Sequence, residues 1–184
     1  MIYILDRGIV DMDTQPLTKA IKRQYDYSLT MLREVIDACP ENLWTERIGL
    51  FPFWQQIYHS LYWADYNIQE SYAGEKIFSW KTKKVITHEL NKEKFVLVEH
   101  LTKDELCSYF QAFIEKKEHF FYKISDTELL APIPNRQDDC TYLDIITNQI
   151  RHIMYHVGHC DCALREQGCS VKAWVSIYGR WEDR

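Results

Sequence analysis

The sequence predicts a single all-α domain built as a four-helix bundle with a short C-terminal extension. A chain of 184 residues that is 46% hydrophobic can bury one sizeable core and is small for two. Its six glycines and five prolines are few for an all-β fold, which needs many tight turns. Four long stretches instead carry apolar residues at helical spacing. We therefore expect one domain over residues 1–184, with a bundle core at about 14–167 and a packed tail at 168–184.

The first helix is expected from Pro16 to Cys39, with Thr14 as its N-cap and Pro40 as the residue that ends it. Apolar residues recur along this stretch with the i, i+3 and i+4 spacing of one buried helix face. They are Leu17, Ile21, Tyr25, Leu29, Leu32 and Ile36.

The second helix should begin near Pro52, because proline suits the first turn of a helix, and should continue to about Tyr72. Gly74 then provides a stop. The residues between are apolar around most of the helix circumference. Such a helix is buried on more than one side, either in the centre of a bundle or at an oligomer interface.

The third helix follows a charged connection of mixed structure, Lys76–Leu101, which is longer than the usual loop of a bundle. It opens with Thr102-Lys103-Asp104-Glu105, which resembles a capping box, and it should end near Ser125. Its core face consists of Leu106, Tyr109, Phe110, Phe113 and Phe120.

The fourth helix should follow a loop at residues 132–135, take Thr141 as its N-cap and run to about Gln167, before Gly168. Its core stripe consists of Tyr142, Ile146, Ile150, Ile153, Val157 and Leu164.

The strongest candidate for chemistry is a group of histidines on this fourth helix. His152, His156 and His159 stand at i, i+4 and i+7, so they share one face, with Cβ atoms roughly 5 to 6 Å apart. One small ion can bridge two imidazoles at that spacing. His152 and His156 also lie at the edge of the core stripe, where side chains can point into the bundle interior. The alternative is a pair of polar residues that line a groove, but buried neutral imidazoles then need partners for four ring nitrogens.

A metal ion needs a further ligand from another helix, and His59 is the best candidate. It stands alone among aromatic residues on the second helix, although a lone core histidine is more often hydrogen-bonded than ligating. His119 follows Lys116-Lys117-Glu118, which indicates a solvated face, and His88 and His100 lie in the charged connection. Three imidazoles plus water are typical of a catalytic zinc site, because a structural site fills all four positions with protein ligands.

The roles of the nearby residues stay open at this stage. His159 could be a fourth ligand, a partner of the ligands or a residue that lines the groove. Cys160 and Cys162 project about 200° apart on a helix, so they cannot chelate one ion together, and Cys160 should face the core. Tyr62, Trp63 and Tyr66 share the side of His59 and could wall an apolar pocket, although core or dimer packing is the simpler interpretation.

Composition excludes several classes of protein. A net charge of -5, a pI near 5.8 and the lack of a Lys/Arg-rich run argue against nucleic-acid binding. The segment Met1–Asp6 lacks the features of a signal peptide, and no stretch approaches the ~20 apolar residues of a membrane span. We therefore expect a cytoplasmic protein without membrane contact. Its six cysteines show no framework spacing, so in a reducing compartment most should be free thiols.

Through its histidines and the segments around them, the chain resembles the DinB/YfiT-like superfamily of four-helix proteins. The resemblance covers about residues 14–167 and depends on three segments in order. They are Asn42-Leu43-Trp44 after Pro40, Phe53-Trp54…His59-Ser60-Leu61…Trp63-Ala64-Asp65-Tyr66, and Asn148-Gln149…His152-x-x-x-His156-Val157-Gly158.

Members of that superfamily often bind a divalent metal between a histidine on helix two and a His-x-x-x-His on helix four. The resemblance thus implies His59, His152 and His156 as ligands, with Gly158 in the place of the family's small residue. The family frequently has a basic residue, Gly and Gln after the last ligand, whereas this chain has Val157-Gly158-His159. The surroundings of the ligands are therefore expected to differ.

Two functions follow from the resemblance. Some relatives transfer low-molecular-weight thiols or isomerise thiol adducts, which implies a metal-dependent thiol S-transferase or hydrolase acting on a small molecule. The alternative is a non-catalytic, stress-linked binding or dimerisation module with a structural or incidental metal, because no glutamate of the His-Glu-x-x-His kind is present as a general base. Zinc or nickel is the expected ion, although imidazole also suits copper and iron.

A homodimer is expected as well. The second helix is apolar around most of its circumference, and a monomeric bundle needs only one apolar stripe on each helix. The tail should pack on the bundle or on a partner, because it carries Trp174, Ile177, Tyr178 and Trp181.

Overall fold

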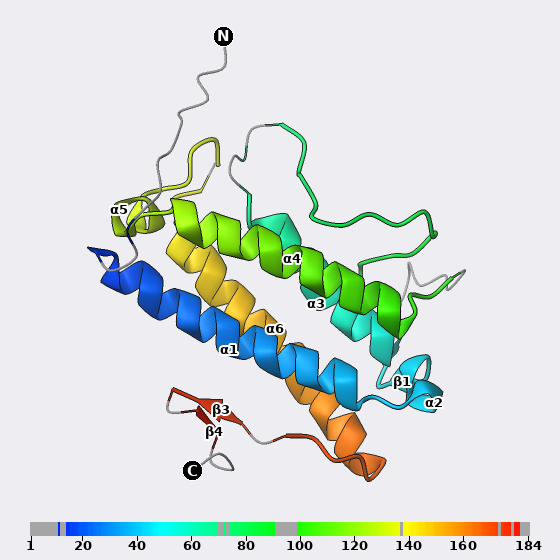
Figure 1. The fold of residues 1–184 in the computed structure, drawn as a ribbon. Coiled ribbons are helices and arrows are strands. Elements are labelled where there is room, and N and C mark those ends of the chain that lie inside the picture. Colours follow the sequence, from blue (N-terminus) through cyan, green and yellow to red (C-terminus); the bar gives the residue numbers. More distant parts are fainter. Residues whose placement is uncertain are drawn as a thin grey trace.

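Helices dominate the part of the chain that the computed structural model describes, which confirms the all-α expectation (Figure 1). The described residues are 11, 14–69, 72, 74–90, 99–136, 138–172, 174–177 and 179–180. Met1–Asp6, Tyr178 and Trp181 lie outside them. In chain order the elements are α1 (Pro16–Ala38), α2 (Glu41–Trp44), β1 (Arg47–Ile48), β2 (Phe51–Pro52), α3 (Phe53–Asn67), α4 (Lys103–Lys123), α5 (Asp126–Leu130), α6 (Tyr142–Glu166), β3 (Val175–Ser176) and β4 (Gly179–Arg180).

Four longer helices enclose the core. α1 packs on α6 and α4, and α3 packs on the same two helices. In Figure 1, α1 and α6 run side by side in one direction, while α3 and α4 run in the opposite direction. Because α3 and α4 point the same way, the chain between them must return along the length of the molecule, and this explains the long connection. No helix among the described residues is both long enough and apolar enough to cross a membrane.

The first helix has the predicted bounds and core face, but its cap differs from the prediction. Tyr25, Leu29, Leu32 and Ile36 are buried, as expected. Thr14 is not the N-cap, because its hydroxyl donates to the carbonyl of Asp11. The first amide groups of α1 donate instead to the carboxylate of Asp126, from Leu17 at 3.1 Å and Thr18 at 2.7 Å. A cap from a residue more than a hundred positions away leaves no local sequence signal.

The second long helix is shorter than predicted, since α3 ends at Asn67 rather than near Tyr72. Every residue from Phe53 to Tyr58 is buried, so the expectation of burial on several sides is confirmed. Part of that burial comes from the connection within the same chain. Asp65, fully buried on α3, accepts hydrogen bonds from the backbone and hydroxyl of Ser79 and from the side chains of Tyr109 and Lys116.

Among the short elements that were not predicted are helix α2, the β1–β2 hairpin and helix α5. The hairpin turns at Gly49 and Leu50, where Gly49 has φ +68°, a conformation that glycine adopts at little cost. α5 begins with a capping box between Ser125 and Glu128, immediately after α4. Each element is too short to carry a periodic pattern, so only its turn and capping residues could have indicated it.

The last two long helices agree with the prediction. The capping box of Thr102 and Glu105 is present, and Thr141 caps α6 together with Asp144. α6 stops at Glu166, before Gly168 with φ +73°. All five predicted core residues of α4 are buried, and on α6 only Ile150 of the predicted stripe is less than fully buried.

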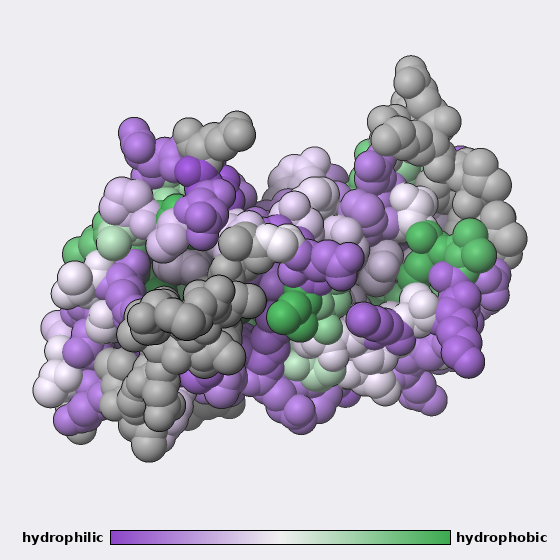
Figure 2. All heavy atoms as spheres, turned by 90° about the horizontal axis from the view of Figure 1, so that it is seen from above, coloured by the Kyte–Doolittle hydropathy of each residue, from purple (hydrophilic) through white to green (hydrophobic). Residues whose placement is uncertain are grey.

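The tail does not pack as completely as expected. It forms the small β3–β4 hairpin, which contacts α1, and Val171 packs against the core. Trp174 and Ile177, however, are 64% and 60% exposed. Another face, seen from above the view of Figure 1, is mainly hydrophilic, with hydrophobic residues in separate patches (Figure 2).

Candidate metal centre

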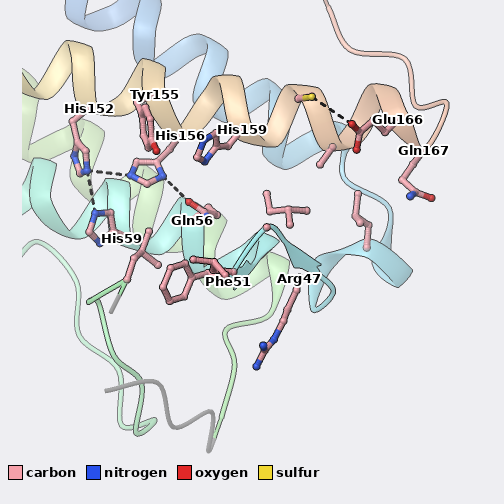
Figure 3. A pocket seen from close by; sticks show the side chains of 17 residues that line it. Arg47, Phe51, Gln56, His59, His152, Tyr155, His156, His159, Glu166 and Gln167 are labelled. Carbon is pink, nitrogen blue, oxygen red and sulfur yellow. Dashed lines mark hydrogen bonds between the residues drawn. The ribbon is translucent and has the colours of Figure 1, made fainter. Parts of the chain in front are cut away.

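Three histidines from two helices converge where α3 packs on α6. His59 comes from α3, and His152 and His156 come from successive turns of α6. The Nε2 atom of His152 lies 3.0 Å from that of His59 and 3.1 Å from that of His156 (Figure 3). One ring nitrogen of each residue lies within 4.8 Å of the other two. The structure thus brings together the three residues that the sequence indicated as a group.

The outer nitrogens of two of these rings are held by acceptors. His59 Nδ1 lies 2.6 Å from the backbone carbonyl oxygen of His88, which can only accept, so this nitrogen carries the proton. His156 Nδ1 lies 2.7 Å from Gln56 Oε1 and donates to it in the same way. In the neutral form, both rings therefore present an unprotonated Nε2 to His152.

Burial favours the neutral form of all three rings. It lowers the pKa of His59 below its usual value. Burial and the nearby His59 lower the pKa of His152 to about 4. Burial, then His59 and His152, lower the pKa of His156 to about 3. At neutral pH the cluster therefore consists of uncharged imidazoles, which is the form that binds metal ions.

The donor set fits a divalent cation. Two ligands about 2.05 Å from a tetrahedral zinc ion are separated by about 3.3 Å, close to the distances from His152 Nε2 to its two neighbours. Without a cation, a neutral His152 can donate its Nε2 proton to only one of the two facing nitrogens, Nε2 of His59 or Nε2 of His156. A metal ion would satisfy all three nitrogens. Among the described residues, no other group of histidine, cysteine or acidic side chains converges in this way.

A cavity of about 730 Å³ opens beside the histidines. Its walls come from α2, α3 and α6, from the β1–β2 hairpin and from Leu90 of the connection. Ile48 and Phe51 contribute apolar surface, whereas Arg47 and Glu166 bring charges to its rim (Figure 3). The volume lies within the range of small-molecule sites in proteins.

His159 lies on the wall of this cavity and outside the converging trio. It is exposed, its ring centroid is 6.4 Å from that of His156, and it packs on Tyr155 at 4.4 Å. This position agrees with a residue that lines the groove.

Of the three aromatic residues near His59, only Trp63 is close to it. The rings of Trp63 and His59 meet edge to face with centroids 6.4 Å apart. None of Tyr62, Trp63 and Tyr66 belongs to the lining of this cavity. Tyr62 stacks on His88 with centroids 3.7 Å apart, and both tyrosines contact Phe78. They pack on the connection, which is the simpler interpretation that the sequence had left open.

The other predicted residues take the expected places. His119 is exposed on α4. Cys160 is fully buried, and burial raises the pKa of its thiol well above the usual range. Cys162 faces away from it and lines the cavity. All six cysteines are free thiols.

Sequence reasoning missed the partners of the ligands. Gln56 is 3% exposed and stands three residues before His59, so a buried polar residue on the same face was the available signal. The role of His88 could not be read from its side chain, because its backbone carbonyl accepts the bond. The connection, which looked featureless, therefore helps to orient the site.

Comparison of the chain with protein-family models, curated proteins and solved structures found no match. Membership of the DinB/YfiT-like superfamily thus stays a prediction from the motifs.

Proposed function

We propose that this chain is a divalent-metal-binding four-helix bundle of the DinB/YfiT-like type, with one zinc or nickel ion held by His59, His152 and His156. The observation that carries the proposal is the orientation of the three rings. Their Nε2 atoms gather at one point, while Nδ1 of His59 and of His156 is committed as a donor to a neighbour. Rings fixed in this tautomer need no rearrangement to bind a cation.

The arrangement of helices supports the same assignment. The single histidine stands on the second long helix, and the His-x-x-x-His pair stands on the last. The long connection between α3 and α4 also suits a bundle with a crossover rather than one with short loops throughout.

The proposed activity is thiol S-transfer or hydrolysis on a small molecule. Three protein ligands leave a coordination position open, as in catalytic zinc sites and unlike structural ones. A divalent ion in such a site lowers the pKa of a bound thiol or water, so that a nucleophile forms near neutral pH. The adjoining cavity gives a substrate access to that position.

Other residues of the cavity would bind the substrate and exchange protons with it. Ile48 and Phe51 would exclude water from an apolar part of the substrate. His159, on the cavity wall and outside the trio, is positioned to exchange a proton with a molecule bound there.

The alternative is a non-catalytic, stress-linked binding or dimerisation module with a structural or incidental metal. This alternative is favoured by the absence of a carboxylate near the three histidines in the described lining of the cavity. Glu166, the acidic residue in the described lining, lies far from the three histidines along α6 and accepts from Cys162 Sγ at 3.8 Å (Figure 3). No described carboxylate of the cavity is therefore placed to act as a general base beside the ion.

A transfer screen tests the enzymatic proposal. Zinc- and nickel-loaded protein would be incubated with cysteine or glutathione and chlorodinitrobenzene, and separately with nitrophenyl esters. We expect turnover that disappears with chelator and in His156→Ala, whereas Cys107→Ser, at a half-buried thiol on α4 outside the cavity lining, serves as a control. Turnover that is equal in His156→Ala would contradict a role of the metal. Stoichiometric metal without turnover in either screen favours the binding module.

A further inference from the structure

A second cavity, of about 700 Å³, lies against the same histidine cluster. It shares His152 and Tyr155 with the first cavity, so His152 borders both. The rest of its described lining comes from the last turns of α3 and from the first half of α6. A molecule bound to the proposed metal can thus extend in two directions.

The second cavity differs from the first in its chemistry. Apart from Trp63, its unshared lining is polar: Asn67, Asn148, Gln149 and Arg151. Arg151 is exposed, and its guanidinium donates to Asn148 Oδ1 at 3.1 Å. No acidic residue belongs to the described lining, so the cavity carries a positive charge without a carboxylate of its own. An arginine in this setting is suited to bind a carboxylate.

Gln149 adds a buried polar side chain to the lining. It lines the cavity, it is 2% exposed, and its Oε1 atom has no hydrogen-bond partner among the described residues. A buried amide oxygen without a partner is unfavourable, and such groups in folded proteins are usually satisfied. This oxygen has almost no accessible surface, so it faces the protein interior and not the open part of the cavity.

We propose that the second cavity binds the carboxylate-bearing end of the substrate, with Arg151 pairing the carboxylate. This inference rests on the proposed function, since the reacting end of the same molecule must reach the metal past His152. The substrate class is then a small organic acid with a metal-binding group, such as a thiol, at the other end. Its apolar reaction partner would occupy the first cavity.

The test compares probes that differ only in charge. Mercaptopropionate and mercaptohexanoate would be titrated calorimetrically into zinc-loaded protein, each against its own uncharged amide. We expect at least one carboxylate to bind about fivefold or more tightly than its amide, because a hydrogen-bonded ion pair at a partly exposed site has that order of effect. Arg151→Gln should remove the preference and leave the zinc content unchanged.

Arg47 provides the matched control, since it lines the first cavity. Arg47→Gln should keep the preference for the carboxylate. Loss of the preference in Arg47→Gln but not in Arg151→Gln would place the carboxylate in the first cavity and overturn the proposal. Equal binding of each acid and its amide, or no binding of either acid, would overturn it as well.

A failure of the proposed metal binding can be told apart from a failure of the proposed carboxylate site. In that case zinc would not bind, or would bind equally in His156→Ala. The same acids and amides would then be titrated into metal-free protein, where the Arg151-dependent preference for the carboxylate is still expected. Its absence there would overturn the second inference independently.

Discussion

Replacement of Gln56 by leucine should weaken metal binding without touching a ligand. Gln56 Oε1 lies 2.7 Å from His156 Nδ1, and both side chains are almost fully buried. Leucine has a similar size but cannot accept the proton, so the Nδ1–H group is left without a partner at a cost of about 1–3 kcal/mol. Part of this cost is relieved if the ring rotates or changes tautomer, and either change removes Nε2 from the ion. We expect about 10- to 100-fold weaker zinc binding.

Competition with a chromophoric chelator measures that affinity, and circular dichroism checks that the variant is folded. Gln56→Glu is the matched control, because its carboxylate still accepts the Nδ1 proton and makes the imidazole a stronger donor to the metal. It should bind zinc at least as tightly as the wild type. A folded Gln56→Leu protein with wild-type affinity would refute the reasoning that this hydrogen bond orients His156.

Three further predictions concern the role of His159, the pH dependence of stability and the oligomeric state. His159→Gln should retain the metal and His156→Ala should lose it, as measured by elemental analysis; equal loss in both would make His159 a ligand. The pKa of His156 is about 3 in the folded protein and near 6.5 when unfolded, so below pH 6.5 the unfolded chain binds more protons. Metal-free protein should therefore lose about 2 kcal/mol of unfolding free energy between pH 7 and 5 through this residue. Urea unfolding of wild type and His156→Leu checks this, and an equal pH dependence in both would contradict it. Finally, light scattering should report a homodimer of twice the 22.1 kDa chain, built partly on exposed Trp174, and Trp174→Ser should weaken it; a mass of one chain at micromolar concentration counts against it.

The long helices could be predicted because their signals are local. Apolar spacing located α1, α4 and α6, and the caps Thr102 and Thr141 fixed two of their starts to within a residue. The same reasoning placed His152 and His156 on one face of a helix. It could not place Thr14 correctly, because the carboxylate that caps α1 belongs to Asp126, in a distant element.

The surroundings of the site depend on contacts between distant segments, and these were not predictable from spacing. The carbonyl of His88 reaches His59 only because the connection returns along α3. The same connection covers Tyr62 and Tyr66, which therefore do not line the cavity beside the histidines. This cover also removes part of the reason to expect a second subunit on α3. The exposed Trp174 and Ile177 remain the structural basis for the dimer prediction.

The central claim is that His59, His152 and His156 hold one divalent ion, and the metal content of untagged protein purified without added metal tests it most directly. Elemental analysis should find about one equivalent of zinc or nickel per chain. X-ray absorption on the same sample should find three imidazole nitrogens, at about 2.0–2.1 Å if the ion is zinc. A metal content below about a tenth of an equivalent per chain that does not rise when zinc is added would contradict the claim. So would a metal content that stays unchanged in each of the variants His59→Ala, His152→Ala and His156→Ala.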